Sequence, residues 1–361
     1  MSATPLTAVA VRTITRALLL REPYDAEFAA WCLMESEEAL ITLLRMAPEF
    51  SARAEVMDVF TSRHLVFRGY APEHLPLLQE MVPDPPRPEA AEPGFIIDFL
   101  GCRTRVAYVG ATAALSGTVQ GAPVPNDWHS DLAEWLPLLR VLRAATDKFR
   151  ILELGMGWAP WLVAGGTLAR RRGIADVRLH GVEGDAQHLE WARLHLADNG
   201  FDPDAHDLRL GVVGANAGTA HFACAWGSPD DYGARPYTGG EHDYRGMGHG
   251  PLRELPMLAL RDLLMAEEAW EFVHMDVQGA EADLVESAME TLQARVAAVL
   301  VSTHSRPLDG RVMEAFWRAG WVLEGERPAN MEFDATRPTL DGMTLHDGQQ
   351  FWRNPRLLPS L

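Results

Sequence analysis

Apolar runs of strand length alternate with helix-like patterns over most of the chain. The expected strands cover residues 151–154, 177–182, 208–213, 272–276, 299–306, 321–324 and 350–353. The expected helices cover residues 158–172, 186–199 and 311–319, and a further helix ends near residue 292. Strands that alternate with helices build open, mostly parallel sheets. The pattern therefore predicts an α/β fold with a Rossmann-like, seven-stranded sheet whose last strand returns antiparallel.

The first part of the chain follows a different pattern. Alanine-, leucine- and glutamate-rich helical runs occupy residues 7–20, 25–48 and 51–61. A proline-rich stretch at 82–93 follows, which is typical of a linker because proline removes backbone donors and stiffens the chain. We expect a helical N-terminal domain, then a linker and connecting segment, then the α/β domain, over residues 1–81, 82–125 and 126–361.

A glycine turn follows the first expected strand, in the sequence Glu153-Leu154-Gly155-Met156-Gly157. Glycines let the backbone approach a ligand closely, and the next helix points its N-terminal amides at the same place. A purely structural turn has the same pattern. The second expected strand ends on Glu183, where such folds bind ribose hydroxyls, although a favourable charge at a helix N-terminus is the alternative. Together the two acids indicate a nucleotide-type cofactor.

The loop does not fit a dinucleotide well, because Pro160 stands where that loop has a third glycine or alanine. An acid two residues before the first glycine instead resembles the signature of class I methyltransferases. This resemblance implies S-adenosylmethionine as the cofactor, with the adenine edge near residues 214–216. The expected cofactor contacts are Glu153, Gly155, Met156, Gly157, Glu183, Gly184, Val213, Gly214 and Asp276.

The fourth expected strand runs into Asp276-Val277-Gln278-Gly279-Ala280-Glu281. This segment resembles the Asp-Val-Glu-Gly-Ala-Glu motif of the FkbM family of methyltransferases, and the resemblance covers residues 127–356. It implies an O-methyltransferase that acts on a sugar hydroxyl of a bacterial glycan, glycolipid or glycosylated metabolite. Gln278 departs from the motif, since many relatives have glutamate there. No adjacent-aspartate cluster follows the strand, so we expect no metal.

Methyl transfer to a hydroxyl needs a base for the acceptor's proton. His304 follows the fifth expected strand beside the expected position of Asp276, and sites in open α/β sheets lie at the carboxyl ends of strands. We predict Asp276 and His304 as catalytic residues, with His304 as the base and a structural histidine as its alternative. The Asp276 carboxylate would orient the donor's amino group, bind the acceptor hydroxyl or coordinate a divalent ion, and the sequence does not separate these roles. The expected acceptor contacts are Gln278, Glu281, His242 and Tyr244.

Two further segments have two interpretations each. Residues 226–250 form a long, glycine-rich polar insertion, which is either a solvated loop or a lid. In a lid, Tyr232, Tyr237 and Tyr244 would stack on a sugar ring. His129 and Glu134 precede the first expected strand, and they either reach the cofactor or lie on the surface of a helix.

Composition narrows the classes of partner. A net charge of −18 argues against nucleic acid, and a single lysine, Lys148, leaves no candidate for Schiff-base or P-loop chemistry. The isolated Cys32, Cys102 and Cys224 predict reduced thiols, and no apolar run is long enough for a membrane span. We therefore expect a cytoplasmic enzyme with a small-molecule or glycan acceptor.

The role of the N-terminal helical unit is open. Residues 17–23 and 47–50 resemble a short helical repeat found beside glycan-handling enzymes. A helical cap on the core and a homodimer interface are the alternatives. A catalytically inactive binding or scaffold protein in a glycan-assembly complex is the alternative to the enzyme as a whole.

Overall fold

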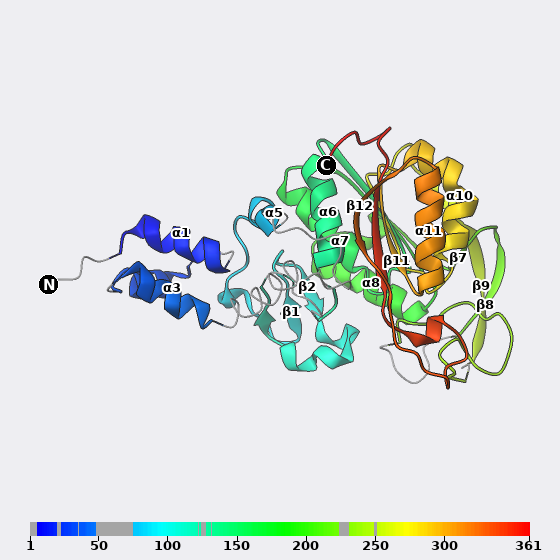
Figure 1. The fold of residues 1–361 in the computed structure, drawn as a ribbon, viewed down its shortest axis with the longest axis horizontal. Helices are drawn as coiled ribbons and strands as arrows, with labels where there is room; N and C mark the ends of the chain where they lie inside the picture. Colours follow the sequence, from blue (N-terminus) through cyan, green and yellow to red (C-terminus); the bar gives the residue numbers. More distant parts are fainter. Residues whose placement is uncertain are drawn as a thin grey trace.

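The computed structural model describes residues 6–19, 23–34, 36–47, 75–121, 123, 128–130, 132–223, 231–248 and 251–361. A seven-stranded sheet in the order β12-β15-β11-β10-β4-β5-β6 forms its centre (Figure 1). The strands are β4 (Lys148–Leu154), β5 (Asp176–Glu183), β6 (Asp207–Leu210), β10 (Phe272–Met275), β11 (Ala298–Thr303), β12 (Val322–Arg327) and β15 (Gly348–Arg353). Only β15 runs antiparallel to its neighbours within this sheet. The predicted α/β fold and its reversed last strand are confirmed.

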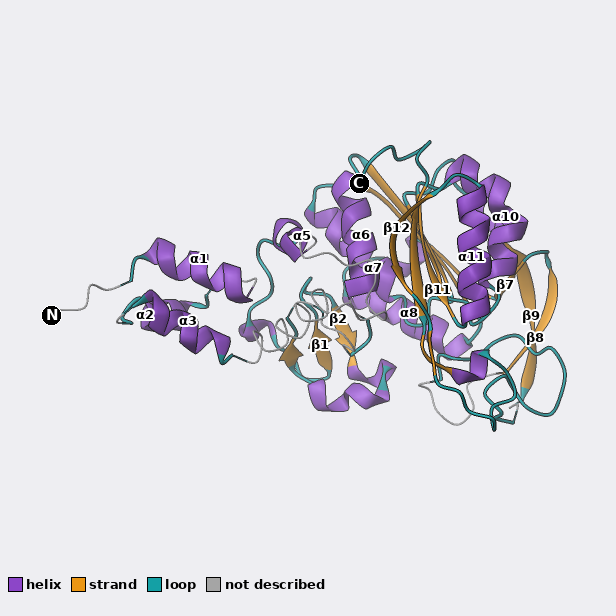
Figure 2. Cartoon of the chain, viewed as in Figure 1, coloured by secondary structure: helices purple, strands orange, loops and turns teal. Residues whose placement is uncertain are grey.

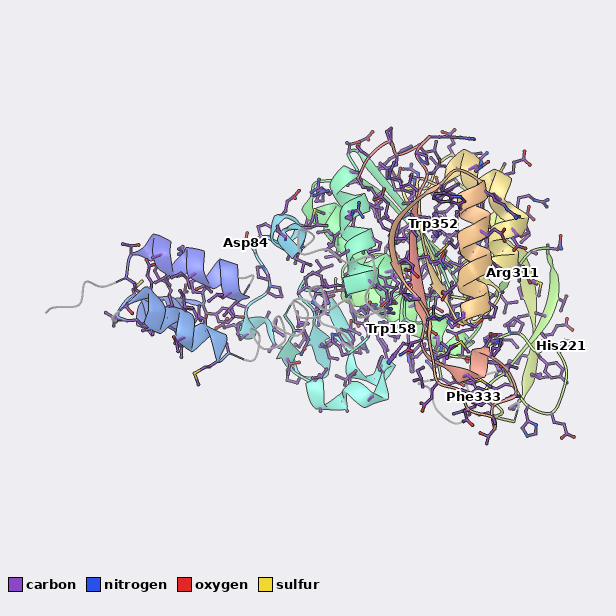
Figure 3. The ribbon with its side chains drawn as sticks, in the orientation of Figure 1. Asp84, Trp158, His221, Arg311, Phe333 and Trp352 are labelled. Atoms are coloured by element: carbon purple, nitrogen blue, oxygen red, sulfur yellow. The ribbon has the colours of Figure 1, made fainter. Side chains whose placement is uncertain are left out.

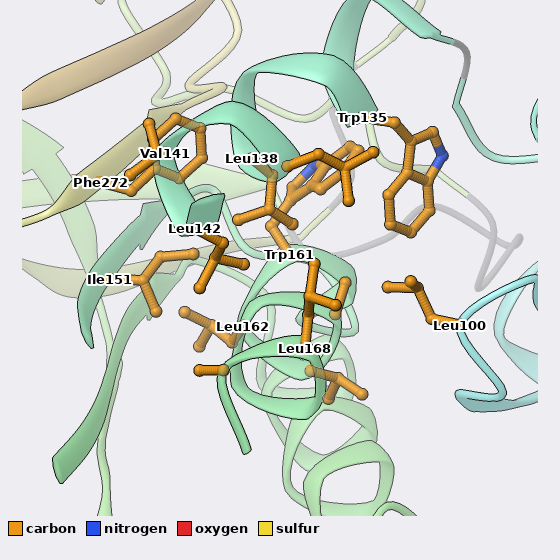
Figure 4. Packing of buried hydrophobic residues seen from close by; sticks show 14 of the residues in the cluster. Leu100, Trp135, Leu138, Val141, Leu142, Ile151, Trp161, Leu162, Leu168 and Phe272 are labelled. Atoms are coloured by element: carbon orange, nitrogen blue, oxygen red, sulfur yellow. The ribbon is translucent and has the colours of Figure 1, made fainter. Parts of the chain in front are cut away.

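Helices cover both faces of this sheet (Figure 2). They are α6 (Leu132–Ala144), α7 (Pro160–Arg171), α8 (Ala186–Asp198), α9 (Leu260–Leu264), α10 (Glu281–Arg295) and α11 (Arg306–Arg318). Side chains of a strand alternate between faces. Accordingly, Phe149 and Ile151 of β4 pack with α6, α7 and α8, and Figure 4 shows Ile151 among their side chains. Leu152 and Leu154 pack with α9, α10 and α11. The near-continuous apolar pattern of β4 follows from this burial on both faces.

A second, three-stranded sheet has the order β7-β9-β8, and its first strand follows β6 in the chain. It consists of β7 (Val212–Gly214), β8 (Gly218–Ala223) and β9 (Leu252–Ala259). The single strand expected over 208–213 is therefore wrong. The chain changes sheets at Gly211, whose N–H donates to the carbonyl of Glu183 at 2.9 Å.

The N-terminal helices pack as a separate unit beside the α/β body (Figure 1). They are α1 (Ala8–Leu19), α2 (Asp25–Trp31) and α3 (Glu37–Arg45), around Val11, Leu19, Leu40 and Leu44. The helix expected over 25–48 is two helices, because the Ser36 hydroxyl accepts from the N–H of Ala39 at 3.1 Å and starts α3. The helix expected over 51–61 lies outside the described residues.

The segment expected as linker and connection contains a small sheet, β2-β1-β3, after its proline-rich stretch. The elements of this region are α5 (Leu75–Met81), β1 (Phe95–Ile97), β2 (Arg103–Arg105) and β3 (Thr118–Val119). Arg105 joins this sheet to α8 through an ion pair with Asp198 at 2.6 Å. Two short strands, β13 (Asn330–Met331) and β14 (Thr344–His346), pair near the C-terminus.

The short 3-10 helices are Pro88–Ala90, Val106–Tyr108, Gly110–Leu115, Pro203–Ala205 and Asp341–Met343. Among the described helices, none combines the length and the apolar character that crossing a membrane requires.

Candidate active site

A cavity of about 360 Å³ opens at the carboxyl ends of β4, β5 and β10, which we call the donor cavity. It lies toward the side of the body that faces the small β1–β3 sheet, where Trp158 is labelled (Figure 3). Its lining includes every expected cofactor contact except Gly214, namely Glu153, Gly155, Met156, Gly157, Glu183, Gly184, Val213 and Asp276. The sequence thus predicted the residues that gather there, and Gly214 continues β7 instead.

The two glycines of the loop after β4 lie where a side chain does not fit. Gly155 has a φ of 72°, and a Cβ there would lie 1.8 Å from the carbonyl oxygen of Asp276. Gly157 has a φ of 52°, and its Cβ would lie 3.2 Å from the ring of Tyr232. Glycine adopts positive φ without a steric cost. The loop is therefore a bare backbone surface between β10 and the segment that contains Tyr232.

Glu153 connects β4 with the N-terminus of α7. Its carboxylate accepts from the N–H of Leu162 at 2.9 Å and from that of Trp161 at 3.5 Å. These hydrogen bonds take the place of an N-cap interaction, because Ala159, the N-cap residue of α7, has no side chain that can accept a hydrogen bond. Burial raises the pKa of Glu153 well above its ordinary value. Glu153 lines the donor cavity and fixes the loop at the same time.

Glu183 binds the same loop from the end of β5. Its two oxygens accept from the N–H groups of Gly157 and Asp185, each at 2.8 Å. A carboxylate has about four lone-pair sites, so acceptor capacity remains for a ligand hydroxyl. The position expected for a ribose contact therefore has the chemistry to make one.

The described part of the long insertion, residues 231–248, closes one side of the donor cavity, and we call it the lid segment. Tyr232 stacks on His188 with a centroid distance of 4.3 Å, and its ring lies edge-on to Trp158. Arg245 stabilises the lid segment through ion pairs with Asp231 at 2.7 Å and Asp243 at 2.8 Å. The structure favours a lid over a solvated loop.

Asp276 lies just beyond β10 in a network that continues into the protein. Its Oδ1 accepts from Gln278 Nε2 at 3.0 Å and lies 3.2 Å from His304 Nε2. The other ring nitrogen, Nδ1, lies 2.8 Å from Oε1 of Glu281, which is fully buried and also accepts from the N–H of Gly279. His304 is thus held between two carboxylates, behind Asp276 and outside the cavity lining.

The charges of this network follow from its geometry. Burial alone would lower the pKa of His304, but Glu281 and Asp276 raise it well above its ordinary value. Burial alone would raise the pKa of Asp276, but hydrogen bonding and attraction to His304 lower it. At neutral pH the pair is an imidazolium and a carboxylate. A protonated imidazole has no lone pair for another proton.

A second cavity of about 340 Å³, the lid cavity, lies under the lid segment and shares Asp231, Ala234 and Pro236 with the donor cavity. His242 and Tyr244, two of the expected acceptor contacts, line it. The others lie elsewhere: Gln278 lines the donor cavity, and Glu281 lines neither because it is fully buried.

Gln278 connects the two cavities. Its Oε1 accepts from the Tyr244 hydroxyl at 3.3 Å, while its Nε2 donates to Asp276. The guanidinium of Arg235 lies over the ring of Tyr244, 3.3 Å from the ring centroid, so that face of the ring is not available to a sugar. The aromatic rings expected to stack on a sugar are thus used in part to hold the lid segment.

Other residues of the site were not predicted or were left open. His129 and Glu134 both line the donor cavity, which favours the cofactor side of the two interpretations. Trp158 and Trp161 complete its wall and were missed, although they flank the glycine turn. Tyr232 lies against Gly157, although the two residues are far apart in the chain, and no sequence pattern predicts this contact.

No group of three or more histidine, cysteine, aspartate or glutamate side chains is placed to hold a metal ion in the part of the chain that the structure describes. Cys32 and Cys102 are free thiols, and Cys224 lies outside the description.

Comparison with known proteins decides the family. No family model matches the sequence. A protein of Jannaschia sp. (strain CCS1) that is named as a methyltransferase is 34% identical over 270 residues, which cover 74% of this chain and 95% of that protein. The chain belongs to this family of methyltransferases.

The methyltransferase is also similar to solved structures at low identity. The precorrin-6y C5,15-methyltransferase of Geobacter metallireducens GS-15 is 10% identical, with a TM-score of 0.34, and the match covers 64% of this chain and 92% of that chain. Methyltransferase FkbM from Methylobacillus flagellatus KT is 14% identical, with a TM-score of 0.35 and coverages of 57% and 44%. Aeropyrum pernix fibrillarin, which was solved with S-adenosylmethionine, is 12% identical, with a TM-score of 0.29 and coverages of 57% and 67%.

The cofactor of the methyltransferase is S-adenosylmethionine, and the donor cavity fits it. The loop at Gly155 and Gly157 is a cradle that a Cβ would fill. Glu183 has acceptor capacity for ribose hydroxyls, and His274, which is 3% exposed in the cavity wall, has no partner for either ring nitrogen. Glycine backbone, an acid after β5 and unpartnered polar atoms are what a nucleoside-type ligand requires.

Proposed function

We propose that the chain is an FkbM-type O-methyltransferase that methylates a sugar hydroxyl of a bacterial glycan, glycolipid or glycosylated metabolite. The observation that carries the proposal is the position of Asp276. It lines the donor cavity, is kept ionised by His304, and connects through Gln278 to Tyr244 in the lid cavity. A base at the junction of a donor site and a second site is the arrangement that methyl transfer to a hydroxyl requires.

When bound, S-adenosylmethionine supplies a methyl group that its sulfonium has already activated. The chain then has to align the acceptor oxygen, exclude water and remove one proton. Asp276 Oδ would accept the hydroxyl proton as the oxygen displaces sulfur from the methyl carbon and the carbon–sulfur electron pair stays on sulfur, and His304 would stabilise the carboxylate beforehand. In this proposal Asp276 is the base, and His304 is a positioning residue because it is already protonated.

The lid cavity is the proposed acceptor site. It is lined by two arginines, Arg235 and Arg245, and by two aspartates, Asp231 and Asp243, and Arg245 pairs with both aspartates. A cavity without net charge that offers hydroxyl, imidazole and carbonyl groups suits a neutral polyol. His242 and Tyr244 are the contacts we assign to it.

The test uses S-adenosylmethionine with an isotopically labelled methyl group and a panel of saccharides, glycolipids and glycosylated metabolites. We expect label in an O-methyl ether, identified by mass spectrometry and NMR. Asp276→Asn should lower kcat by about 10²–10⁴-fold, which is the usual contribution of general base catalysis. The matched control is Asp204→Asn, an exposed aspartate (86% of its side chain) paired with Arg193.

Label on nitrogen, carbon or nucleic acid would refute the sugar hydroxyl as the acceptor. Cofactor binding without methyl transfer to any acceptor would instead favour a binding protein that has kept the fold.

A further inference from the structure

The donor cavity contains six carboxylates and, among the described residues that line it, no arginine or lysine. The carboxylates belong to Glu134, Glu153, Glu183, Asp185, Asp231 and Asp276. Burial raises the pKa of Glu153, and Asp231 pairs with Arg245 at 2.7 Å, so these two residues add little negative charge. Glu134, Glu183, Asp185 and Asp276 still make the lining acidic.

The histidines of the cavity do not reverse this balance. Burial lowers the pKa of His129 to about 3 and that of His274 to about 4, so both rings are neutral at pH 7. The third lining histidine, His188, stacks on Tyr232 and lies 3.8 Å from Glu183.

The nearby cations are compensated within the protein. Arg235 and Arg245 line the lid cavity, and each forms an ion pair with an aspartate. His304 lies behind Asp276, and its two ring nitrogens face three carboxylates, of Glu281, Asp276 and Asp347.

An independent sign of a polar ligand comes from His274. Its side chain is 3% exposed, lies in the wall of the cavity near Trp161, and leaves both ring nitrogens without a hydrogen-bond partner. A buried polar group without a partner is costly, so such groups are rare. A neutral imidazole offers one donor and one acceptor, which suits a zwitterionic amino acid end of a ligand.

We propose that the donor cavity selects its ligand by positive charge, and binds the sulfonium of S-adenosylmethionine more tightly than the neutral sulfide of S-adenosylhomocysteine. The inference rests on the proposed methyl transfer. When the methyl group leaves, its bonding electron pair remains on sulfur, and the ligand loses one positive charge. A cavity with carboxylates and no cation then loses an attraction, so the product dissociates readily.

The experiment is isothermal titration of the full-length protein with S-adenosylmethionine, S-adenosylhomocysteine and sinefungin, in which an amine-bearing carbon replaces the sulfonium. We expect the two cationic ligands to bind about tenfold more tightly than S-adenosylhomocysteine, or better. Equal or tighter binding of S-adenosylhomocysteine would overturn the inference and leave the methyltransferase intact. Binding of none of the three would overturn both, so the two failures are distinct.

Variants test the cause. Asp276→Asn removes one lining charge with little change in shape, and should bring the ratio of the two dissociation constants closer to one. Asp204→Asn removes an exposed charge away from the cavity lining and should leave the ratio unchanged. An unchanged ratio in Asp276→Asn, together with sinefungin that binds as weakly as S-adenosylhomocysteine, would show that charge is not what the cavity selects.

Discussion

His304 bridges two carboxylates inside the protein, and its replacement should be costly. It is 4% exposed, with Nδ1 at 2.8 Å from Glu281 Oε1 and Nε2 at 3.2 Å from Asp276 Oδ1. His304→Gln removes the positive charge and leaves the fully buried Glu281 carboxylate without a counter-charge. Loss of one partner from a buried ion pair costs about 3–5 kcal/mol. We expect the free energy of unfolding to fall by about this amount at pH 7.

The pH dependence of this effect has a definite sign. The pKa of His304 is raised well above its ordinary value, so the folded state holds the proton more tightly than the unfolded chain. The stabilisation is complete at a pH below the unfolded value of about 6.5 and is lost as the pH rises through the raised pKa. The difference in unfolding free energy between wild type and His304→Gln should therefore shrink at alkaline pH.

Urea unfolding followed by tryptophan fluorescence measures both quantities. A second substitution, Glu281→Gln in the His304→Gln background, serves as the control for the charge argument. It should recover about 1 kcal/mol or more, because no uncompensated buried carboxylate then remains. A loss of less than about 1 kcal/mol in His304→Gln, or a difference that grows with pH, would refute a charged His304.

Further substitutions test other parts of the structure. Gly155→Ala should abolish cofactor binding and lower the free energy of unfolding by more than about 2 kcal/mol, because its Cβ would collide with the Asp276 carbonyl. The control is Gly310→Ala, which lies in open space on α11 and should stabilise the protein by about 0.5–1 kcal/mol. Equal effects of the two substitutions would contradict a steric collision at Gly155. Asp98→Asn should stabilise the protein by about 1–3 kcal/mol at pH 8 and not at pH 4, because burial raises the pKa of Asp98 to about 7 and folding favours its protonated form. Urea unfolding at both pH values measures this difference, and a larger stabilisation at pH 4 would contradict the prediction. Gln278→Glu should move the acid limb of the pH profile of kcat/KM about one pH unit higher, because it places a second carboxylate beside Asp276. If the acid limb does not move, Asp276 is not the base.

The sequence predicted the central sheet because its strands have a strong pattern. Six expected strands match β4, β5, β10, β11, β12 and β15 within a few residues. The strand β9, Leu252–Ala259, was missed because it contains Pro256 and the charged Arg253 and Glu254. It forms nonetheless, since β7 and β8 pair with it from both sides.

The site was predicted where its residues follow strand ends, and less well where distant segments meet. Glu183 ends β5 and Asp276 follows β10, and both line the donor cavity, as the parallel sheet requires. The state of His304 was not predictable, because it depends on Glu281 lying 23 positions earlier on α10 and facing its ring. A histidine at a strand end is the same in sequence whether it is neutral or held charged by two acids.

The departure of Gln278 from the FkbM motif that its segment resembles has a physical consequence in the proposed reaction. Its φ of 58° is left-handed, which costs on the order of 1 kcal/mol in a non-glycine residue, so the surrounding loop holds it in place. Gly279 follows with a φ of 112°, and a Cβ there would meet the Arg235 guanidinium at 3.0 Å. An amide in this position donates to Asp276, whereas a glutamate would repel it. The ionised state of Asp276 is thus set by hydrogen bonds and by His304 within this chain, and the glutamine contributes to the base at the point where the donor and lid cavities meet.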